Sequence, residues 1–234
     1  MEKDFANHLL KEGAKNYDII AQDYARTRRY NSPDLTELAK LAKPGEKVLD
    51  LGCANGRMFE LFSPEGVEYY GVDISPKLID IAKKLYPAGN FQTADALNLP
   101  FENNSFDKVY YISVLHHIPS KENRLKSFQE IERILKPKGV LILRVWDLLR
   151  IEKGFTLLLK YTFLKLLGRT KLDFCDLMMP WKDFERKQKG ERYFHCFFGW
   201  ELEKLSKEAG LEAKKIWRGG KGRLANIYLF AQKP

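Results

Sequence analysis

The sequence has little cysteine and no long uninterrupted apolar run. Its three cysteines are scattered and form no CxxC pair: Cys53, Cys175 and Cys196. This spacing excludes a disulfide framework and predicts reduced thiols and no zinc or other metal site within the chain. The most apolar stretch, "FTLLLKYTFLKLL", is short and is interrupted by Lys160 and Lys165, so we expect no helix that spans a bilayer.

The first residues of the sequence do not have the pattern of a secretion signal. "MEKDFANHLLKEG" contains no apolar core like that of a secretion signal, so we expect a cytoplasmic protein. With 44% hydrophobic and 13% aromatic residues, the 234-residue chain has enough apolar material for one sizeable core. We therefore expect a single α/β domain, either alone or with an insertion.

Positive charge is concentrated in the last third of the sequence. Residues 147–234 hold 19 Lys and Arg against 11 Asp and Glu, whereas residues 1–146 hold 21 against 20. A basic region of this kind is typical of a surface that meets a large anion, of which nucleic acid is the commonest. A solvated basic face that serves only solubility is an equal alternative.

Strand-like and helix-like segments alternate up to residue 146. Two helices come first, over 5–29 and 31–42, and the second starts at a Ser32–Pro33 pair that suits a helix N-terminus. The expected strands are "EKVLDLG", "VEYYGVD", "NFQTAD", "FDKVYYISVL" and "VLILRVW", and the helices between them cover 55–62, 75–86 and 123–135. This rhythm predicts an α/β fold with a doubly wound, mostly parallel sheet covered by helices on both faces.

The alternation of strands and helices ends at residue 146. An apolar helix with interspersed lysines, over 151–167, and a polar stretch up to 190 indicate an insertion. A helix over 201–209 follows, then two strands joined by "GGKG", a connection so short that it predicts an antiparallel hairpin. We expect one domain, 1–234, made of N-terminal helices (1–43), a cofactor-binding core (44–146), a basic helical insertion (147–198), and a terminal helix and hairpin (199–234).

A glycine turn and three carboxylates mark the carboxyl edge of this sheet. The first strand runs into "GCANGR", with the spacing Gly52-x-x-x-Gly56 rather than the G-x-G-x-x-G of a dinucleotide site. Asp50, Asp73 and Asp95 end three successive strands, so they would line one crevice. Such carboxylates repel phosphate but suit a nucleoside that carries positive charge, such as S-adenosylmethionine. The alternative is that each Asp only caps the following helix.

Four segments resemble a known enzyme family. "VLDLGCANGR", "YYGVDIS", "ADALNLPFENNSFD" and "LKPKGVLIL" are similar, in order, to the motifs of Rossmann-like S-adenosylmethionine-dependent methyltransferases. The resemblance covers 44–146 and implies a seven-stranded sheet whose last strand is antiparallel. Ala54 departs from the family, where glycine is frequent, and should tighten the loop without loss of binding. The expected cofactor site comprises Tyr24, Asp50, Gly52, Cys53, Ala54, Gly56, Asp73, Ile74, Asp95, Ala96 and Ser113.

A second resemblance is narrower and concerns the methyl acceptor. The order of four stretches is similar to that in the tRNA wobble-uridine carboxymethyl methyltransferases of archaea and eukaryotes: "YDIIAQDYARTRRY", "VLHHIPSKENRLKSFQEIERILKPKG", "MPW" and "RYFHCF…GWELEKLSKEAG…IYLFAQK". That family esterifies the carboxylate of 5-carboxymethyluridine, usually with a small zinc-binding activator subunit. The resemblance implies the tRNA anticodon loop and such a subunit as partners, and neither DNA nor a membrane.

A carboxylate acceptor is already nucleophilic, so its site needs groups that position it more than it needs a base. Arg192, Tyr193 and His195 would hold the uridine carboxylate or a flanking phosphate, because a guanidinium fork and neighbouring donors bind such groups. Arg28 would close over the cofactor from the first helix. The alternative is that the aromatic residues of this run only pack a helix onto the sheet and that Arg192 stays solvated.

Two further groups are candidate contacts of the acceptor. His116 and His117 follow the fourth strand; we assign His116 to the site, and which of the two touches substrate stays open. The insertion would contact phosphates and stack on a splayed base, or its helix over 151–167 would act as a lid with a buried apolar face. The phosphate contacts would be Lys160, Lys165, Arg169, Lys171, Arg186, Lys187 and Lys189, and the stacking residues Phe155, Phe174 and Trp181.

Two other functions stay open at this point. A small-molecule O- or N-methyltransferase would share the same fold and motifs, although the basic region and the "RYFH" run would then be unexplained. A non-catalytic partner that binds cofactor or RNA is less favoured, because the glycines and all three strand-end carboxylates are present.

Overall fold

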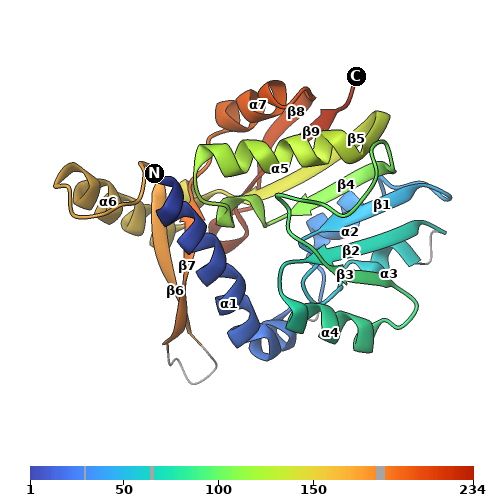
Figure 1. Cartoon of the computed structure of the whole chain (residues 1–234), viewed down its shortest axis with the longest axis horizontal. Helices are drawn as coiled ribbons and strands as arrows, with labels where there is room; N and C mark the ends of the chain where they lie inside the picture. The colour runs from blue at the N-terminus through green and yellow to red at the C-terminus, as the bar shows by residue number, and fades with distance from the viewer. Residues whose placement is uncertain (29, 64–65, 183–187) are drawn as a thin grey trace.

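The computed structural model describes residues 1–28, 30–63, 66–182 and 188–234, and its centre is a seven-stranded sheet (Figure 1). The strand order is β3-β2-β1-β4-β5-β9-β8. The strands are β1 (Lys47–Leu51), β2 (Glu68–Asp73), β3 (Asn90–Thr93), β4 (Phe106–Ile112), β5 (Leu135–Trp146), β8 (Glu212–Gly219) and β9 (Asn226–Gln232). The first five are parallel, and β9 runs antiparallel to both β5 and β8. The predicted fold class is confirmed.

Helices cover both faces of the sheet, and two apolar layers result (Figure 1). One face is covered by α2 (Pro33–Ala39), α3 (Phe59–Phe62) and α4 (Pro76–Leu85), and the other by α5 (Lys121–Ile134) and α7 (Gly199–Glu208). Local sequence explains where two of them begin. The hydroxyl of Ser75 accepts a hydrogen bond from Leu78 N at the start of α4, and Ser120 does the same for Asn123 N at the start of α5.

The expected helix over 55–62 is wrong in its first half, because α3 begins only at Phe59. The backbone of Ala54 (φ 52°) and of Gly56 (φ 75°) lies in the left-handed region, which a right-handed helix cannot accommodate. A tight turn, closed by a hydrogen bond from Gly56 N to Cys53 O, therefore replaces the first helical turn.

The insertion contains a β-hairpin that the sequence analysis did not predict. Strand β6 (Asp176–Lys182) pairs antiparallel with β7 (Gln188–His195), where only a polar stretch was expected. The preceding helix α6 (Glu152–Leu166) packs on this hairpin through Leu158, Leu177 and Phe194. In Figure 1 the long helix α1 (Lys3–Thr27) runs between α4 and the hairpin, near the carboxyl ends of the parallel strands.

Candidate functional site

The loop after β1 requires glycine at Gly52. Its φ is 80°, and a Cβ atom there would lie 2.1 Å from Cγ2 of Val114. The amides of Gly52 and Cys53 both donate to Val72 O, at 2.7 and 2.9 Å, which fixes the loop to the neighbouring strand β2. The turn thus brings its backbone close to the end of β4 without a side chain between them.

Asp73, the last residue of β2, is anchored by this loop. One carboxylate oxygen accepts a hydrogen bond from Ala54 N and the other from Ser75 N, each at 2.9 Å. Burial raises the pKa of Asp73 to about 6, although these two backbone donors favour its charged form. Each oxygen has a second lone pair, so the carboxylate can still accept hydrogen bonds from a ligand.

A cavity of about 270 Å³ lies between α1 and the carboxyl ends of the strands. Eight of the eleven predicted cofactor residues line it: Tyr24, Gly52, Ala54, Asp73, Ile74, Asp95, Ala96 and Ser113. From α1 only Tyr24 was predicted to line the cavity; Leu10, Gly13, Ala14 and Tyr17 of the same helix, and Val114 and Ile118 after β4, were not. The regular spacing of Tyr17 and Tyr24 along α1, seven residues apart, was the available signal.

The other three predicted cofactor residues, Asp50, Cys53 and Gly56, do not line the cavity. Asp50 is 2% exposed and accepts a hydrogen bond from the Tyr69 hydroxyl at 2.8 Å, and burial raises its pKa to about 7. Cys53 belongs to the buried cluster on the α2–α4 side of the sheet. These residues therefore support the loop through their conformation and buried contacts, and they do not face the cavity.

The cavity fits a nucleoside without phosphates. Two carboxylates, Asp73 and Asp95, lie on the lining of a mostly apolar space, beside side chains such as Leu97 and Ile112. Carboxylates accept hydrogen bonds from hydroxyl or amino groups and repel phosphate. The residues present therefore suit S-adenosylmethionine, whose ribose hydroxyls and base amino group are donors of this kind.

From the part of the lining formed by Tyr17 and His117, a chain of polar contacts leads to β7. The carbonyl oxygen of Tyr193 can only accept, so Nδ1 of His117 donates to it at 2.9 Å. Nε2 of His117 then accepts from the Tyr17 hydroxyl, also at 2.9 Å, and Nη1 of Arg192 donates to that hydroxyl oxygen at 3.5 Å. Burial and the Arg192 cation lower the pKa of His117 to about 3, so the ring is neutral near pH 7.

Comparison with known proteins agrees with this geometry. A family model described as a methyltransferase domain matches residues 49–143. A solved structure described as a SAM-dependent methyltransferase from Methanosarcina mazei has a TM-score of 0.72 at 20% identity, and the match covers 87% of this chain and 98% of that one. Residues 49–143 match a methyltransferase domain, and the chain has the fold of this methyltransferase structure.

The similarity to curated relatives covers more of this chain than the family model does. A tRNA (carboxymethyluridine(34)-5-O)-methyltransferase of Arabidopsis thaliana is 33% identical over 62% of this chain and 35% of the relative. The enzyme of the same name from Saccharomyces cerevisiae is 32% identical over 57% of this chain and 47% of the relative. The matched segment thus spans about a third to a half of these relatives. A further structure, at 17% identity and a TM-score of 0.64, is described as a complex between the Haloferax volcanii Trm112 methyltransferase activator and a methyltransferase.

Near the cofactor cavity of the methyltransferase domain, Arg192 is held between aromatic rings. Its guanidinium carbon lies 4.6 Å from the centre of the Trp181 ring and 5.1 Å from that of Phe194, and the residue is 7% exposed. No carboxylate in the described part of the chain pairs with it, and its Nε has no hydrogen-bond partner there. Arg192 is therefore a buried cation without a counter-ion among the described residues.

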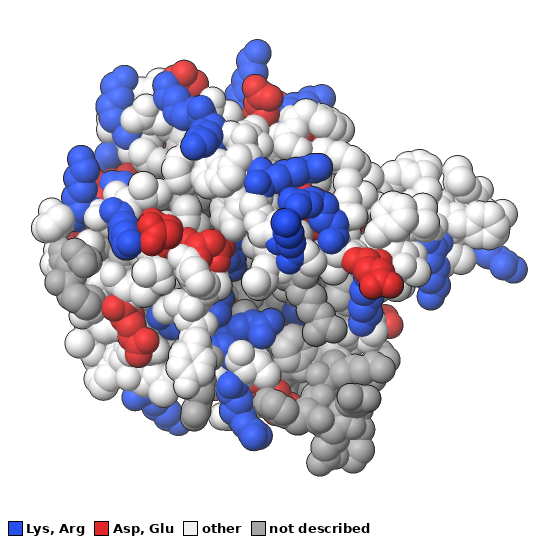
Figure 2. Space-filling model, turned by 180° about the vertical axis from the view of Figure 1, so that it is seen from behind, with Lys and Arg blue, Asp and Glu red and all other residues white. Residues whose placement is uncertain are grey.

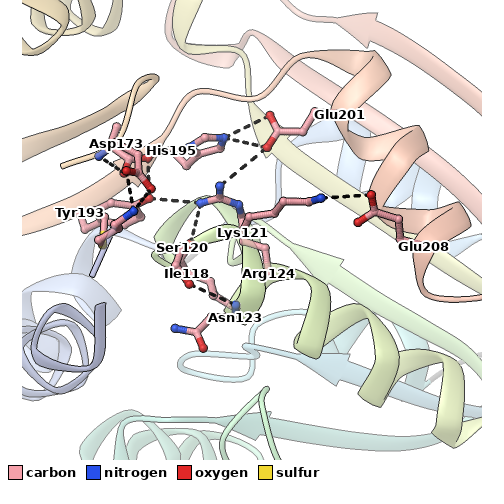
Figure 3. A network of polar contacts seen from close by, with 12 residues as sticks. Ile118, Ser120, Lys121, Asn123, Arg124, Asp173, Tyr193, His195, Glu201 and Glu208 are labelled. Atoms are coloured by element: carbon pink, nitrogen blue, oxygen red, sulfur yellow. Dashed lines mark hydrogen bonds and ion pairs between the residues drawn. The ribbon is translucent and has the colours of Figure 1, made fainter. Parts of the chain in front are cut away.

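Tyr193 and His195 point to the other side of β7 and lie outside the cavity, in a buried network with Arg124 (Figure 3). The Tyr193 hydroxyl donates to Oδ1 of Asp176 at 2.6 Å and accepts from Nη1 of Arg124 at 3.2 Å. The two ring nitrogens of His195 face Asp176 Oδ1, at 2.7 Å, and the carboxylate of Glu201, at 3.0 Å. This arrangement joins the hairpin to α5 and α7.

His116, predicted to contact the acceptor, and Arg28, predicted to close over the cofactor, also lie outside the cavity lining. His116 is fully buried, stacks on Phe194 with 5.2 Å between ring centres, and has no partner for Nε2 in the described residues. Burial lowers its pKa well below the usual range. Arg28, just after α1, lies over the Tyr24 ring at 5.6 Å. Of the two histidines, the structure places His117 in the cavity wall.

The predicted phosphate contacts of the insertion are spread around α6. Lys160, Arg169 and Lys171 are exposed, and Lys165 lies 3.9 Å from Asp173. Of the predicted stacking residues, Phe155 and Phe174 are exposed, whereas Trp181 is half-buried against the Tyr24 ring. The other predicted contacts, Arg186, Lys187 and the side chain of Lys189, lie outside the described part of the chain.

Proposed function

We propose that this chain transfers the methyl group of S-adenosylmethionine to the carboxylate of 5-carboxymethyluridine at the wobble position of tRNA. Two curated relatives whose names state this activity are 32–33% identical to it over more than half of its length. The acceptor assignment depends on one structural observation: Arg192 is a buried cation with no carboxylate partner among the described residues, one contact away from the cofactor cavity.

Arg192 is suited to bind an anionic acceptor. A guanidinium held between two rings keeps its planar fork in one orientation, which favours two-point binding of a carboxylate over a loose ionic contact. The cost of burying an unpaired cation is offset when an anion arrives. Phosphate would use the same fork, so the nucleotide flanking the modified uridine is the alternative ligand of this group.

The reaction needs orientation more than proton transfer. Bound S-adenosylmethionine supplies a methyl group on a positively charged sulfur. In our proposal Arg192 holds the acceptor carboxylate toward the cavity, and Tyr17, fixed by its hydrogen bond to His117, lies between the two sites. Because the acceptor is already an anion, the neutral His117 is not required as a base, and it keeps the Tyr17 hydroxyl in place.

We further propose that a small zinc-binding activator docks on this domain. The Haloferax neighbour is described as a complex with an activator, and β3 is an edge strand of the seven-stranded sheet here. Edge strands are natural places for a partner to add to a sheet. An assay of this chain alone therefore has to be accompanied by one with a candidate activator.

The test is methyl transfer from labelled S-adenosylmethionine to tRNA that carries 5-carboxymethyluridine, with and without the activator. Wild type should form a base-labile methyl ester. Arg192→Ala should lower the rate by roughly ten- to a hundredfold, the loss expected for a charge-assisted hydrogen bond. Its binding of S-adenosylmethionine should stay unchanged, because Arg192 does not line the cofactor cavity.

Glu191→Ala is the matched control, because it removes an exposed charge from the adjacent position of β7. Full activity is expected for it. If wild type binds cofactor but methylates no such tRNA under either condition, the tRNA assignment is wrong, and small-molecule acceptors become the next candidates. If Arg192→Ala is as active as wild type, the acceptor is held by other groups.

A further inference from the structure

Helix α6 is apolar on two opposite faces. On its inner face, Leu158 and half-buried Tyr161 pack against the hairpin, and Gly154 lies against Leu148. The opposite side, which we call the α6 outer face, carries five large apolar side chains that are 46–70% exposed: Phe155, Leu159, Phe163, Leu166 and Leu167. A helix that is apolar all round is normally covered on both sides. An exposed apolar row of this length marks an interaction site.

The α6 outer face is a projecting ridge. In Figure 1 α6 lies at the extreme end of the molecule, beyond the hairpin and far from the sheet. From behind, in Figure 2, the same lobe projects from the body; it is largely free of charged side chains, with Lys and Arg along one margin. A convex ridge of this kind suits a broad, deformable surface better than it suits a partner helix, which needs a groove.

The charges beside the ridge are positive. Lys153 and Lys160 are exposed on α6, and Arg169 and Lys171 are exposed in the segment that follows it. Of the two acidic residues nearby, Glu152 is exposed at the first turn, and Asp173 is engaged with Lys165 and the N-terminal amine. The occupant of this face should therefore combine apolar material with negative charge.

Two other occupants agree less well with these observations. A second copy of the chain, paired through a two-fold axis at the middle of α6, would bring the two Lys160 side chains toward each other. Nucleic acid would match the charge, but three of the five ridge side chains are leucines, which offer no ring for a base to stack on.

We propose that the α6 outer face is a peripheral docking site for an anionic phospholipid surface. Its apolar row would enter the boundary between headgroups and acyl chains, while Lys153 and Lys160 stay at the level of the phosphates. No helix in the described ranges is long and apolar enough to cross a membrane, so the contact is superficial. The interrupting lysines argue against a spanning helix and at the same time suit a surface-bound one.

The experiment is co-sedimentation with vesicles of phosphatidylcholine containing phosphatidylglycerol, and with vesicles of phosphatidylcholine alone. Wild type should bind the anionic vesicles. Phe163→Glu combined with Leu166→Glu should weaken that binding at least ~10-fold. Leu85→Glu is the matched control, because Leu85 is 54% exposed at the end of α4, on another part of the surface, and it should bind like wild type. All variants should unfold at the same temperature as wild type, because every substituted side chain is largely exposed.

The contribution of positive charge to vesicle binding is tested with a separate pair of variants. Lys160→Glu should weaken binding to anionic vesicles, and Lys84→Glu, an equally exposed change on α4, should not. Raising the salt from about 0.1 to 1 M, which shortens the screening length from ~10 to ~3 Å, should also weaken binding. The proposal is overturned if wild type ignores anionic vesicles, or if the double variant binds them as wild type does. It is equally overturned if ultracentrifugation shows a wild-type dimer that Phe163→Glu dissociates. The same holds if Phe163→Glu weakens the binding of tRNA and leaves the binding of anionic vesicles unchanged.

Discussion

At the scale of single residues, the cofactor cavity is set by which way each strand-end side chain points. Asp73 ends its strand and lines the cavity, whereas Asp50 lies one residue before the end of β1 and turns toward Tyr69. Successive side chains of a strand alternate between the two faces of a sheet, so a shift of one residue decides between cavity and core. The sequence analysis read all three carboxylates as equivalent, because spacing alone does not place the last residue of a strand.

Asp73 predicts how cofactor binding depends on pH. A ribose diol donates to the ionised carboxylate, and the pKa of Asp73 is raised to about 6, so protonation below pH 6 removes acceptors for the diol. Affinity for S-adenosylmethionine should then be constant above about pH 7 and fall by up to tenfold per pH unit below 6. Isothermal titration calorimetry between about pH 5 and 8 would measure this change.

Asp73→Asn tests the assignment. The amide leaves one backbone donor of the loop unmatched and should weaken cofactor binding roughly tenfold or more at pH 8, with no further loss below pH 6. Asp80→Asn, on the exposed side of α4, should keep the wild-type profile. A pH dependence near 7 that persists in Asp73→Asn would instead point to Asp50, whose pKa is raised to about 7.

At the scale of elements, the parallel core could be predicted and the hairpin could not. "VLDLG" and "VLILRVW" are apolar runs that end in glycine or in a change of pattern, and both are strands, β1 and β5. In the hairpin, Pro180 and several charges interrupt β6 and β7, and the buried polar side chains of β7 look like a surface pattern. Burial of Tyr193 and His195 depends on partners from three other elements, α5, β6 and α7, of which Arg124 of α5 is 69 residues away from Tyr193.

The buried network predicts that Asp176 is important for stability. Asp176 is 1% exposed and accepts from Tyr193, His195 and the backbone amide of Asp173. Asp176→Asn removes the buried negative charge and leaves His195 and Arg124 to share Glu201 alone. Leaving a buried hydrogen-bond donor unpaired typically costs about 1–3 kcal/mol, so urea unfolding should show a loss of about 2 kcal/mol.

Glu191→Gln makes the same chemical change at an exposed position of the hairpin and should alter stability by less than about 0.5 kcal/mol. The comparison also separates structural from acceptor roles. Cofactor affinity of folded Asp176→Asn should equal that of wild type, because the network does not line the cavity. An Asp176→Asn protein as stable as wild type would show that the network contributes little.

At the scale of the whole molecule, the cofactor cavity and the excess positive charge belong to different parts of the sequence, a nearly neutral first part and a basic last part. The cofactor cavity is built from residues 10–118, and the excess positive charge is carried by residues 147–234. The sequence predicted this division, since net charge needs no knowledge of contacts. The sequence placed Arg192 at the acceptor site, but it did not predict the hairpin that carries Arg192 or its contact with Tyr17 of α1, because both depend on residues distant in sequence.

If tRNA is the acceptor, this charge distribution makes its binding depend on salt. A protein that neutralises Z phosphates loses affinity with a log–log slope of roughly −0.7Z to −0.9Z, so about four contacts imply a loss on the order of 100-fold between 50 and 200 mM salt. Arg169→Ala should reduce the magnitude of that slope by about one, because Arg169 is exposed in the basic insertion. Lys84→Ala removes an equally exposed charge from the nearly neutral first part and should leave the slope unchanged. Filter binding of tRNA at several salt concentrations gives all three slopes, and equal slopes for the two variants would mean that the basic last part is not the RNA-binding side.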